Sequence, residues 1–189
     1  KAKYIKGLER TIPGSTSIIK DEATETHEWV LLKATYDKYF NRKGRIRFGF
    51  YGEAVYSDQT LFENYTASIL TANAFTPLPE SQTLFQERLR AYTYLAGGLK
   101  TILLFTDNLH LRLEGYVFQP HKRIFQNEFN KASFGLEWAS REYIASSALV
   151  YHTPLGPIAA TVNYYDRQED HWSFLVHFGY LIFNKKSLH

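Results

Sequence analysis

The chain has 189 residues and a net charge of +3, with 22 basic and 19 acidic side chains mixed along the sequence. The basic residues form no stripe, so nucleic acid is not an expected partner. Cysteine is absent, which excludes a disulfide framework and thiolate metal ligands. Aromatic residues make up 16% of the chain, and no run approaches the roughly 20 apolar residues that a spanning helix needs. The length suits one domain.

The first part of the chain lacks a regular pattern. Residues 1–27 contain Pro13 and Gly14 followed by mixed charge, and we predict an irregular loop or the end of an earlier strand there. Residues 28–189 are expected to form one β-domain. The opening residues, KAKYIKGLER, are too highly charged for a signal peptide, so we expect an internal or processed part of a longer protein.

The strongest pattern is an alternation of apolar and polar residues over stretches longer than the usual strand of about 5 to 6 residues. In Arg45–Tyr56 the apolar series is Ile46, Phe48, Phe50, Gly52, Ala54 and Tyr56. The residues between them are Arg45, Arg47, Gly49, Tyr51, Glu53 and Val55. A strand directs successive side chains to opposite faces, whereas a helix would mix the two series. The segment is therefore predicted to be a strand with one apolar and one charged face.

Other segments separate their residues in the same way. Leu109–Phe118 sets Leu109, Leu111, Leu113, Gly115 and Val117 against His110, Arg112, Glu114, Tyr116 and Phe118. Ala132–Ala139 sets Ala132, Phe134, Leu136 and Trp138 against Ser133, Gly135, Glu137 and Ala139. Weaker alternation marks Trp29–Phe40, Tyr65–Ala74, Tyr92–Phe105, Tyr143–His152, Ile158–Tyr165 and Trp172–Phe183. The chain is therefore predicted to contain about nine long strands.

Short connections between these strands are rich in Gly, Pro, Asn, Asp or Ser. They are Asn41–Gly44, Ser57–Thr60, Thr106–Asn108, Thr153–Gly156 and Asp166–Asp170. Short links between long neighbouring strands predict an antiparallel meander. Two longer loops, Phe75–Arg88 and Gln119–Lys131, contain prolines and are not expected to be helical.

Alternation alone does not show which face meets which solvent, because a soluble sandwich or barrel also has one apolar and one polar face per strand. Strand length favours a membrane, since a tilted strand that crosses a bilayer needs about 9 to 11 residues. Aromatic residues also lie near strand ends on the apolar faces, where their rings suit the membrane interface. They are Tyr56, Trp138, Tyr143, Tyr151 and Tyr164. The fold class we predict is all-β, an antiparallel transmembrane β-barrel.

The polar faces of these strands mix charges of opposite sign with glycines. In a membrane barrel such faces line a lumen of ion pairs and water. The lumen-facing polar candidates are Arg45, Arg47, Glu53, Lys100, His110, Arg112, Glu114 and Glu137. The same faces would suit an exposed sheet of a soluble protein, so they do not separate the two hypotheses.

The C-terminal third carries a more specific signal. Leu149–Asp166 reads LVYHTPLGPIAATVNYYD, and the chain ends with HWSFLVHFGYLIFNKKSLH. Pro154 and Pro157 bracket Gly156 and fix a chain reversal. This arrangement resembles the last strands of BamA-superfamily surface-antigen barrels, in which a Pro-Leu-Gly-Pro turn precedes the penultimate strand and an aromatic-rich strand closes the barrel.

Four segments narrow this resemblance: NYYD, FGYLIFNKKSL, the LRLEGYVFQP of Leu111–Pro120, and GLERTIPGS near the start. Together they are similar to patatin-like outer-membrane proteins of Bacteroidetes-type bacteria. The resemblance implies a sixteen-stranded barrel, of which this chain is the C-terminal part, and a patatin-like phospholipase domain upstream. It also implies location in the bacterial outer membrane. The implied partners are outer-membrane lipid, the barrel-assembly machinery, and the remaining strands of the same barrel or a second copy.

The family's terminal strand carries an assembly signal: a polar residue, a glycine two residues later, and hydrophobic and aromatic residues near the end. His177, Gly179 and Ile182 approximate this signal, and Phe183 belongs to the same terminal strand. Asn184 stands where the family has its final aromatic residue.

The chain lacks the pattern of an enzyme site. A patatin-like lipase needs a Gly-x-Ser-x-Gly turn, which does not occur; Gly14-Ser15 is the nearest fragment and is better interpreted as a turn. The seven histidines lack the spacing of a helical metal site. Glu53, Glu114 and Glu137 are candidates for an acid/base pair, but ion pairs with arginines such as Arg47 and Arg112 are favoured. We therefore expect these residues to contain no catalytic, cofactor or metal site.

The leading functional hypothesis is a membrane anchor or translocation barrel for the upstream phospholipase domain. The first alternative is a soluble β-barrel that binds a small apolar ligand, with the apolar faces turned inward. The second is an open-edged sheet that self-associates, because unpaired strands seek partners. The soluble barrel would not need detergent, whereas the other two would.

Overall fold

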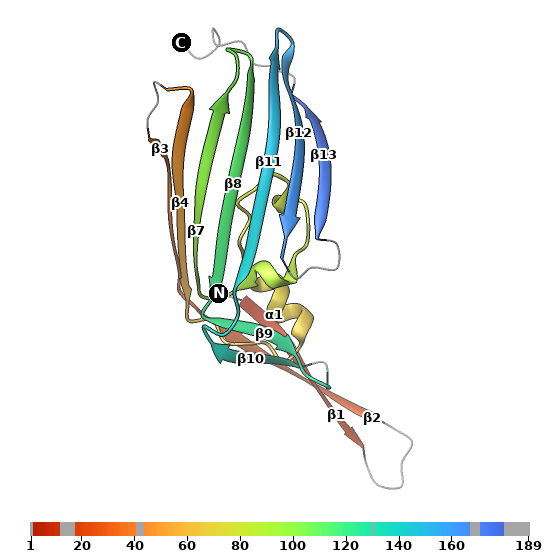
Figure 1. Ribbon diagram of the computed structural model, residues 1–189. Helices are drawn as coiled ribbons and strands as arrows, with labels where there is room; N and C mark the ends of the chain where they lie inside the picture. Colours follow the sequence, from red (N-terminus) through yellow and green to blue (C-terminus); the bar gives the residue numbers. More distant parts are fainter. Residues whose placement is uncertain (1, 12–17, 41–43, 130, 167–170, 180–189) are drawn as a thin grey trace, which may run out of the picture.

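The computed structural model describes residues 2–11, 18–40, 44–129, 131–166 and 171–179, with side chains described from residue 28 onward. Its main feature is a seven-stranded sheet in the order β13-β12-β11-β8-β7-β4-β3, in which every neighbouring pair is antiparallel (Figure 1). The strands are β3 (Leu31–Phe40), β4 (Ile46–Ser57), β7 (Tyr94–Leu104), β8 (Leu109–Pro120), β11 (Glu142–Thr153), β12 (Gly156–Tyr165) and β13 (Trp172–Phe178). The prediction of an all-β, antiparallel fold is confirmed.

The two faces of this sheet separate as the alternation predicts. On one face large apolar side chains are exposed, including Phe48 and Phe50 of β4, Leu99 of β7 and Phe174 of β13. On the other face Glu53, Lys100 and Glu114 are buried together with aromatic residues. We call these the apolar face and the polar face.

Residues 58–93, here named the covering segment, join β4 to β7 and pack on the polar face. They contain α1 (Tyr65–Thr71), β5 (Asn73–Ala74), the 3₁₀ turns η1 (Glu80–Gln82) and η2 (Glu87–Leu89), and β6 (Arg90–Ala91). Figure 1 draws the later, yellow-green part of this segment behind the central strands and the yellow helix α1 below them, beside β9 and β10. The main core lies between the segment and the sheet: Val55, Phe75, Leu78, Leu89, Ala91, Tyr94, Tyr116, Phe118, Ile144 and Tyr165.

Phe75 lies at the centre of this core and is 0% exposed. Its ring stacks on Phe118 with centroids 5.5 Å apart, and it meets Tyr94 and Tyr116 edge-on, each at 6.2 Å. Offset and edge-to-face aromatic contacts add to the stabilisation from buried area. One side chain of the covering segment therefore contacts aromatic residues of β7 and β8.

The predicted strand Tyr65–Ala74 is wrong, because residues 65–71 form α1. Asn64 caps this helix by accepting a hydrogen bond from the backbone of Ala67 at 3.1 Å. Tyr65, Ile69 and Ala72 pack into one cluster, and their i, i+4, i+7 spacing is that of a helix face. A test for period-two alternation does not detect this spacing. The short β5 follows the helix.

Within residues 1–27, for which we predicted an irregular loop or the end of an earlier strand, the described residues form two paired antiparallel strands, β1 (Ala2–Thr11) and β2 (Ile18–His27). The two strands pair with each other and, among the described residues, with no other strand. Their sequences lack the apolar alternation of a half-buried strand, so the pattern that reveals the main sheet is missing here.

A second hairpin corrects the predicted strand Ala132–Ala139 and the predicted loop Gln119–Lys131. β10 (Ala132–Glu137) pairs with β9 (Lys122–Gln126) in a two-stranded sheet between β8 and β11. Trp138 follows β10 with a φ of 56° and packs against His121, with ring centroids 5.0 Å apart. Trp138 therefore does not lie at the end of a strand of the main sheet. Apolar and polar residues alternate in a short hairpin as they do in a long strand of the main sheet. The sequence pattern therefore could not distinguish β10 from a strand of that sheet.

We expect Phe75→Ala to lower the free energy of unfolding by about 3 to 5 kcal/mol, because it leaves a cavity in the aromatic core. Phe85→Ala is the matched control, since Phe85 belongs to the same segment and is half exposed. Denaturant unfolding in detergent micelles, followed by fluorescence, measures both. Equal effects of the two substitutions would contradict the packing described.

Candidate functional site

The polar face and the covering segment together form the candidate functional site. Six of the predicted lumen-facing candidates share this face: Arg47 and Glu53 on β4, Lys100 on β7, and His110, Arg112 and Glu114 on β8. Arg45 precedes β4 and is exposed. Glu137 lies outside the seven-stranded sheet, on β10, where Lys122 lies 3.0 Å away and lowers the pKa of its carboxyl group.

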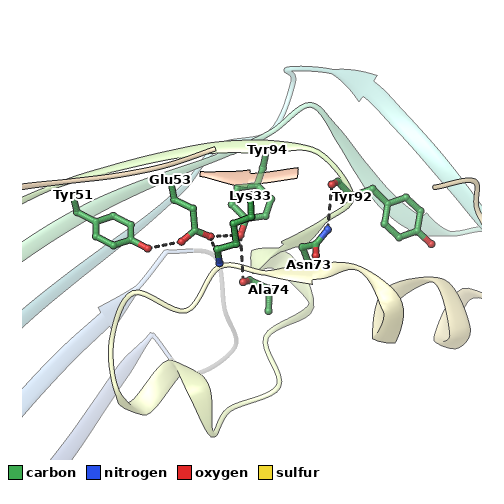
Figure 2. A network of polar contacts seen from close by, with 7 residues as sticks. All are labelled: Lys33, Tyr51, Glu53, Asn73, Ala74, Tyr92 and Tyr94. Atoms are coloured by element: carbon green, nitrogen blue, oxygen red, sulfur yellow. Dashed lines mark hydrogen bonds and ion pairs between the residues drawn. The ribbon is translucent and has the colours of Figure 1, made fainter. Parts of the chain in front are cut away.

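Glu53 is the centre of a polar network that connects three strands (Figure 2). Its carboxylate accepts hydrogen bonds from the hydroxyl groups of Tyr51 and Tyr94, both at 2.5 Å, and pairs with Lys33 Nζ at 2.8 Å. Glu53 is only 6% exposed, so these three partners replace the water that a carboxylate would otherwise need. The Tyr94 hydroxyl also lies 3.3 Å from the carbonyl oxygen of Ala74. The network therefore connects β3, β4 and β7 to the covering segment.

Glu80 attaches the covering segment to the opposite side of the sheet. Its carboxylate accepts hydrogen bonds from Asn163 Nδ2 on β12 and from Ser173 Oγ on β13, the latter at 2.5 Å. The turn that presents Glu80 is held by Ser81, whose hydroxyl bonds both backbone groups of Leu78 at 3.1 and 2.6 Å. A charged acceptor strengthens such bonds relative to neutral ones.

A third attachment lies between these two. Arg88 of the covering segment is 3.6 Å from the carboxylate of Glu142, which begins β11 and is 2% exposed. Within the segment itself, Tyr65 donates a hydrogen bond to Glu87 at 3.0 Å. Burial, together with this bond, raises the pKa of Tyr65 to about 12. The segment is thus held at three places, from β7 across to β13.

Lys100 and Arg112, two other charged residues of the polar face, also form ion pairs. Lys100 Nζ lies 2.8 Å from Asp37, and its charge also lies 5.2 Å from the ring of Tyr51. Arg112 pairs with Glu114 at 3.3 Å. Glu114 thus pairs with Arg112, as predicted, whereas the basic partner of Glu53 among the described residues is Lys33.

His110 and His152 meet on the same face, with ring centroids 5.2 Å apart. No group of three or more His, Asp or Glu side chains suited to a metal ion occurs among the described residues. In the same part of the chain, no helix is both long enough and apolar enough to cross a membrane.

The predicted turn between the last strands is present in the structure. Pro154 and Leu155 connect β11 to β12, and Gly156 has a φ of 148°, a conformation that favours glycine. The hydroxyl of Thr153 closes the turn by donating to the Gly156 carbonyl at 2.6 Å. Next to it, Gly179 donates its backbone N–H to the Pro157 carbonyl at 2.8 Å. Phe183, with Ile182 and Asn184, lies outside the described residues.

The sequence indicated the charged residues of the polar face but not the covering segment that buries them. Glu80, Arg88, Asn163 and Ser173 were not among the candidates. One feature of the sequence could have indicated the covering segment: the long link between β4 and β7. Connections longer than about 12 to 15 residues are uncommon unless they have a functional role. No family model, curated protein or solved structure matches this chain.

We expect Glu80→Ala to loosen the covering segment, because it removes two charge-assisted hydrogen bonds at one end. Trypsin should then cleave at Arg88 or Arg90 roughly tenfold faster or more, since about 1.4 kcal/mol corresponds to a factor of ten. Glu87→Ala is the control, because the bond from Tyr65 lies within the segment. Equal cleavage rates would show that Glu80 does not hold the segment on the sheet.

Proposed function

We propose that the seven-stranded sheet is part of the wall of an outer-membrane β-barrel, which serves as membrane anchor or translocation barrel for an upstream patatin-like phospholipase domain. The observation that carries this proposal is the apolar face. Its exposed side chains are Leu32, Tyr36, Phe40, Ile46, Phe48, Phe50, Tyr56, Leu95, Leu99, Leu113, Val117, Tyr143, Leu149, Tyr151, Ile158, Trp172, Phe174, Val176 and Phe178. Soluble monomers rarely expose contiguous apolar patches beyond a few hundred Å². Lipid hydrocarbon is a solvent in which such a face is stable.

The strand lengths support the same proposal. β4, β8 and β11 have 12 residues each. At about 3.3 Å per residue such a strand is about 40 Å long, and at a tilt of about 45° it crosses about 28 Å. That matches the apolar band of roughly 25 Å on membrane barrels.

The residues at the strand ends agree with a membrane interface. Because the strands alternate in direction, Tyr56, Tyr143, Tyr164 and Trp172 stand near one end of the apolar face. Amphipathic rings of this kind favour the headgroup level. The one charge on this face within the seven described strands is Lys38, two residues from the end of β3. A lysine so placed can extend its ammonium group to the interface.

The free edges of the sheet indicate how the wall would be completed. In the described residues, β3 pairs only with β4 and β13 only with β12. Seven alternating strands make β3 and β13 run in the same direction, so joining them directly, or to a second copy of the same orientation, would create parallel pairs. An odd number of further strands keeps every pair antiparallel. Sixteen strands, as the resemblance implies, would require nine more, since 16 − 7 = 9.

The connections suggest an orientation. At one end of the sheet the links are short, residues 41–45, 105–108 and 154–155, and at the other end residues 58–93 and 121–141 form long excursions. Outer-membrane barrels have short periplasmic turns and longer external loops. The covering segment and the β9–β10 hairpin would therefore lie at the outer end.

The soluble alternative has less support. A soluble barrel that binds an apolar ligand needs its apolar faces to line the interior. The described core instead packs against the opposite face, through residues such as Tyr94, Tyr116 and Ile144. This arrangement favours the membrane barrel.

We expect Leu99→Arg to prevent or weaken insertion into lipid vesicles, at a cost of about 2 to 4 kcal/mol, because residue 99 lies at the middle of β7 on the apolar face and is 70% exposed. Thr35→Arg is the matched control, since Thr35 lies on the polar face of β3, opposite Glu53 of β4 in the strand register. Vesicle flotation and heat-modifiable gel mobility measure insertion. If both variants behave like the parent chain, the apolar face does not meet lipid.

The upstream phospholipase is tested separately, on the longer protein. A Gly-x-Ser-x-Gly turn encoded before residue 1, with a phospholipase activity lost on replacing its serine, is the expected result. An upstream region without this turn would remove the patatin-like part of the proposal and leave the membrane barrel standing.

A further inference from the structure

The apolar face contains a groove formed by two adjoining hollows of about 600 and 570 Å³. Both hollows are lined by Leu99, Gly115, Ala145 and Tyr164, so they run into one another across β7, β8, β11 and β12. Trp172 of β13 lines one end of the groove. The groove lies on the side of the sheet opposite the covering segment.

Two glycines at the floor of the groove are not required by the chain's own packing. A Cβ atom added to Gly115 would have no neighbour within 4 Å, and one added to Gly97 would meet only the Tyr51 carbonyl oxygen at 3.8 Å. By contrast, a Cβ on Gly98 would lie 2.3 Å from the ring of Tyr116. Glycine within a strand is destabilising relative to alanine and often marks a place where a ligand approaches closely. At Gly115 and Gly97 the only visible gain is depth of the groove.

One register row extends from the floor of the groove to its aromatic end. Gly115, Ala145, Tyr164 and Trp172 are paired in sequence across β8, β11, β12 and β13. The rings of Tyr164 and Trp172 lie 5.0 Å apart. Such rings favour the level of the lipid headgroups. The groove therefore opens where a headgroup would lie and continues where an acyl chain would lie.

We infer that this groove binds one acyl chain of a membrane lipid, with the lipid headgroup at the level of Tyr164 and Trp172. The inference rests on the proposed membrane location. Within lipid, an unfilled hollow forfeits dispersion contacts on its whole lining, and a flexible hydrocarbon chain restores them. A protein partner would also need to place a polar backbone against Gly115 and Ala145, whereas a lipid chain brings no polar group to this part of the lining.

Trp172 provides the readout, because it lines the groove. The full chain, with Trp29→Phe and Trp138→Phe so that Trp172 alone fluoresces, is placed in phosphatidylcholine vesicles that contain increasing fractions of phosphatidylcholine with brominated acyl chains. Bromine quenches tryptophan only at close approach. We expect Gly115→Leu, which fills the floor, to reduce the quenching at a given bromolipid fraction about twofold or more, and Gly115→Ala to have an intermediate effect.

Ala34→Leu is the matched control, because it adds the same side chain to the same face on β3, outside the groove, and should leave the quenching unchanged. Equal quenching of Trp172 in the parent, Gly115→Leu and Ala34→Leu chains, all inserted in vesicles, would overturn the groove inference and leave the membrane proposal standing. A parent chain that does not enter vesicles would overturn both. If native mass spectrometry shows that Gly115→Leu separates a dimer, a second copy occupies the groove and the lipid inference is wrong.

Discussion

The structure depends on one constraint: a long antiparallel sheet has its polar face packed and its apolar face bare. Buried charges require partners. Glu53 has Lys33, Tyr51 and Tyr94, and Lys100 has Asp37. Residues such as Phe174 are exposed, and apolar area in water is unfavourable by about 25 cal/mol per Å², a cost that the proposed lipid environment would remove. The same sheet meets both requirements if the polar face encloses a lumen and the apolar face meets lipid.

The covering segment follows from this constraint. A lumen-like face bordered by tyrosines and carboxylates would hold water unless other residues filled it, and Phe75 and Leu78 fill its centre. The segment has three attachments to the sheet: the Tyr94 hydroxyl at the Ala74 carbonyl oxygen, the ion pair of Arg88 with Glu142, and the hydrogen bonds of Glu80 with Asn163 and Ser173. Because each bond is polar and lies over a packed aromatic core, the segment has one position on the wall rather than many.

The sequence predicted the parts of the fold in which apolar and polar residues alternate along a whole strand. Residues Ile46 to Tyr56 alternate without interruption because each side chain belongs either to the bare face or to the packed face, and the structure places them so. The faces of β8 and the turn at Gly156 could be predicted for similarly local reasons. Helix α1 could not, because Asn64 and Ile69 depend on a cap and a period of 3.6, and the surrounding residues also fit a strand. The site was missed at Glu80 because its partner Asn163 lies 83 residues away, and no local pattern reports that contact.

The claim that the apolar face meets lipid is tested most directly by placing an environment-sensitive label on each face. The chain has no cysteine, so Leu99→Cys and Thr35→Cys each provide a single attachment site for a fluorophore such as NBD. In vesicles, the account predicts blue-shifted emission from residue 99 that is quenched by lipid-soluble quenchers, and water-like emission from residue 35. Water-like emission from both positions, with the chain monodisperse in plain buffer, would contradict it.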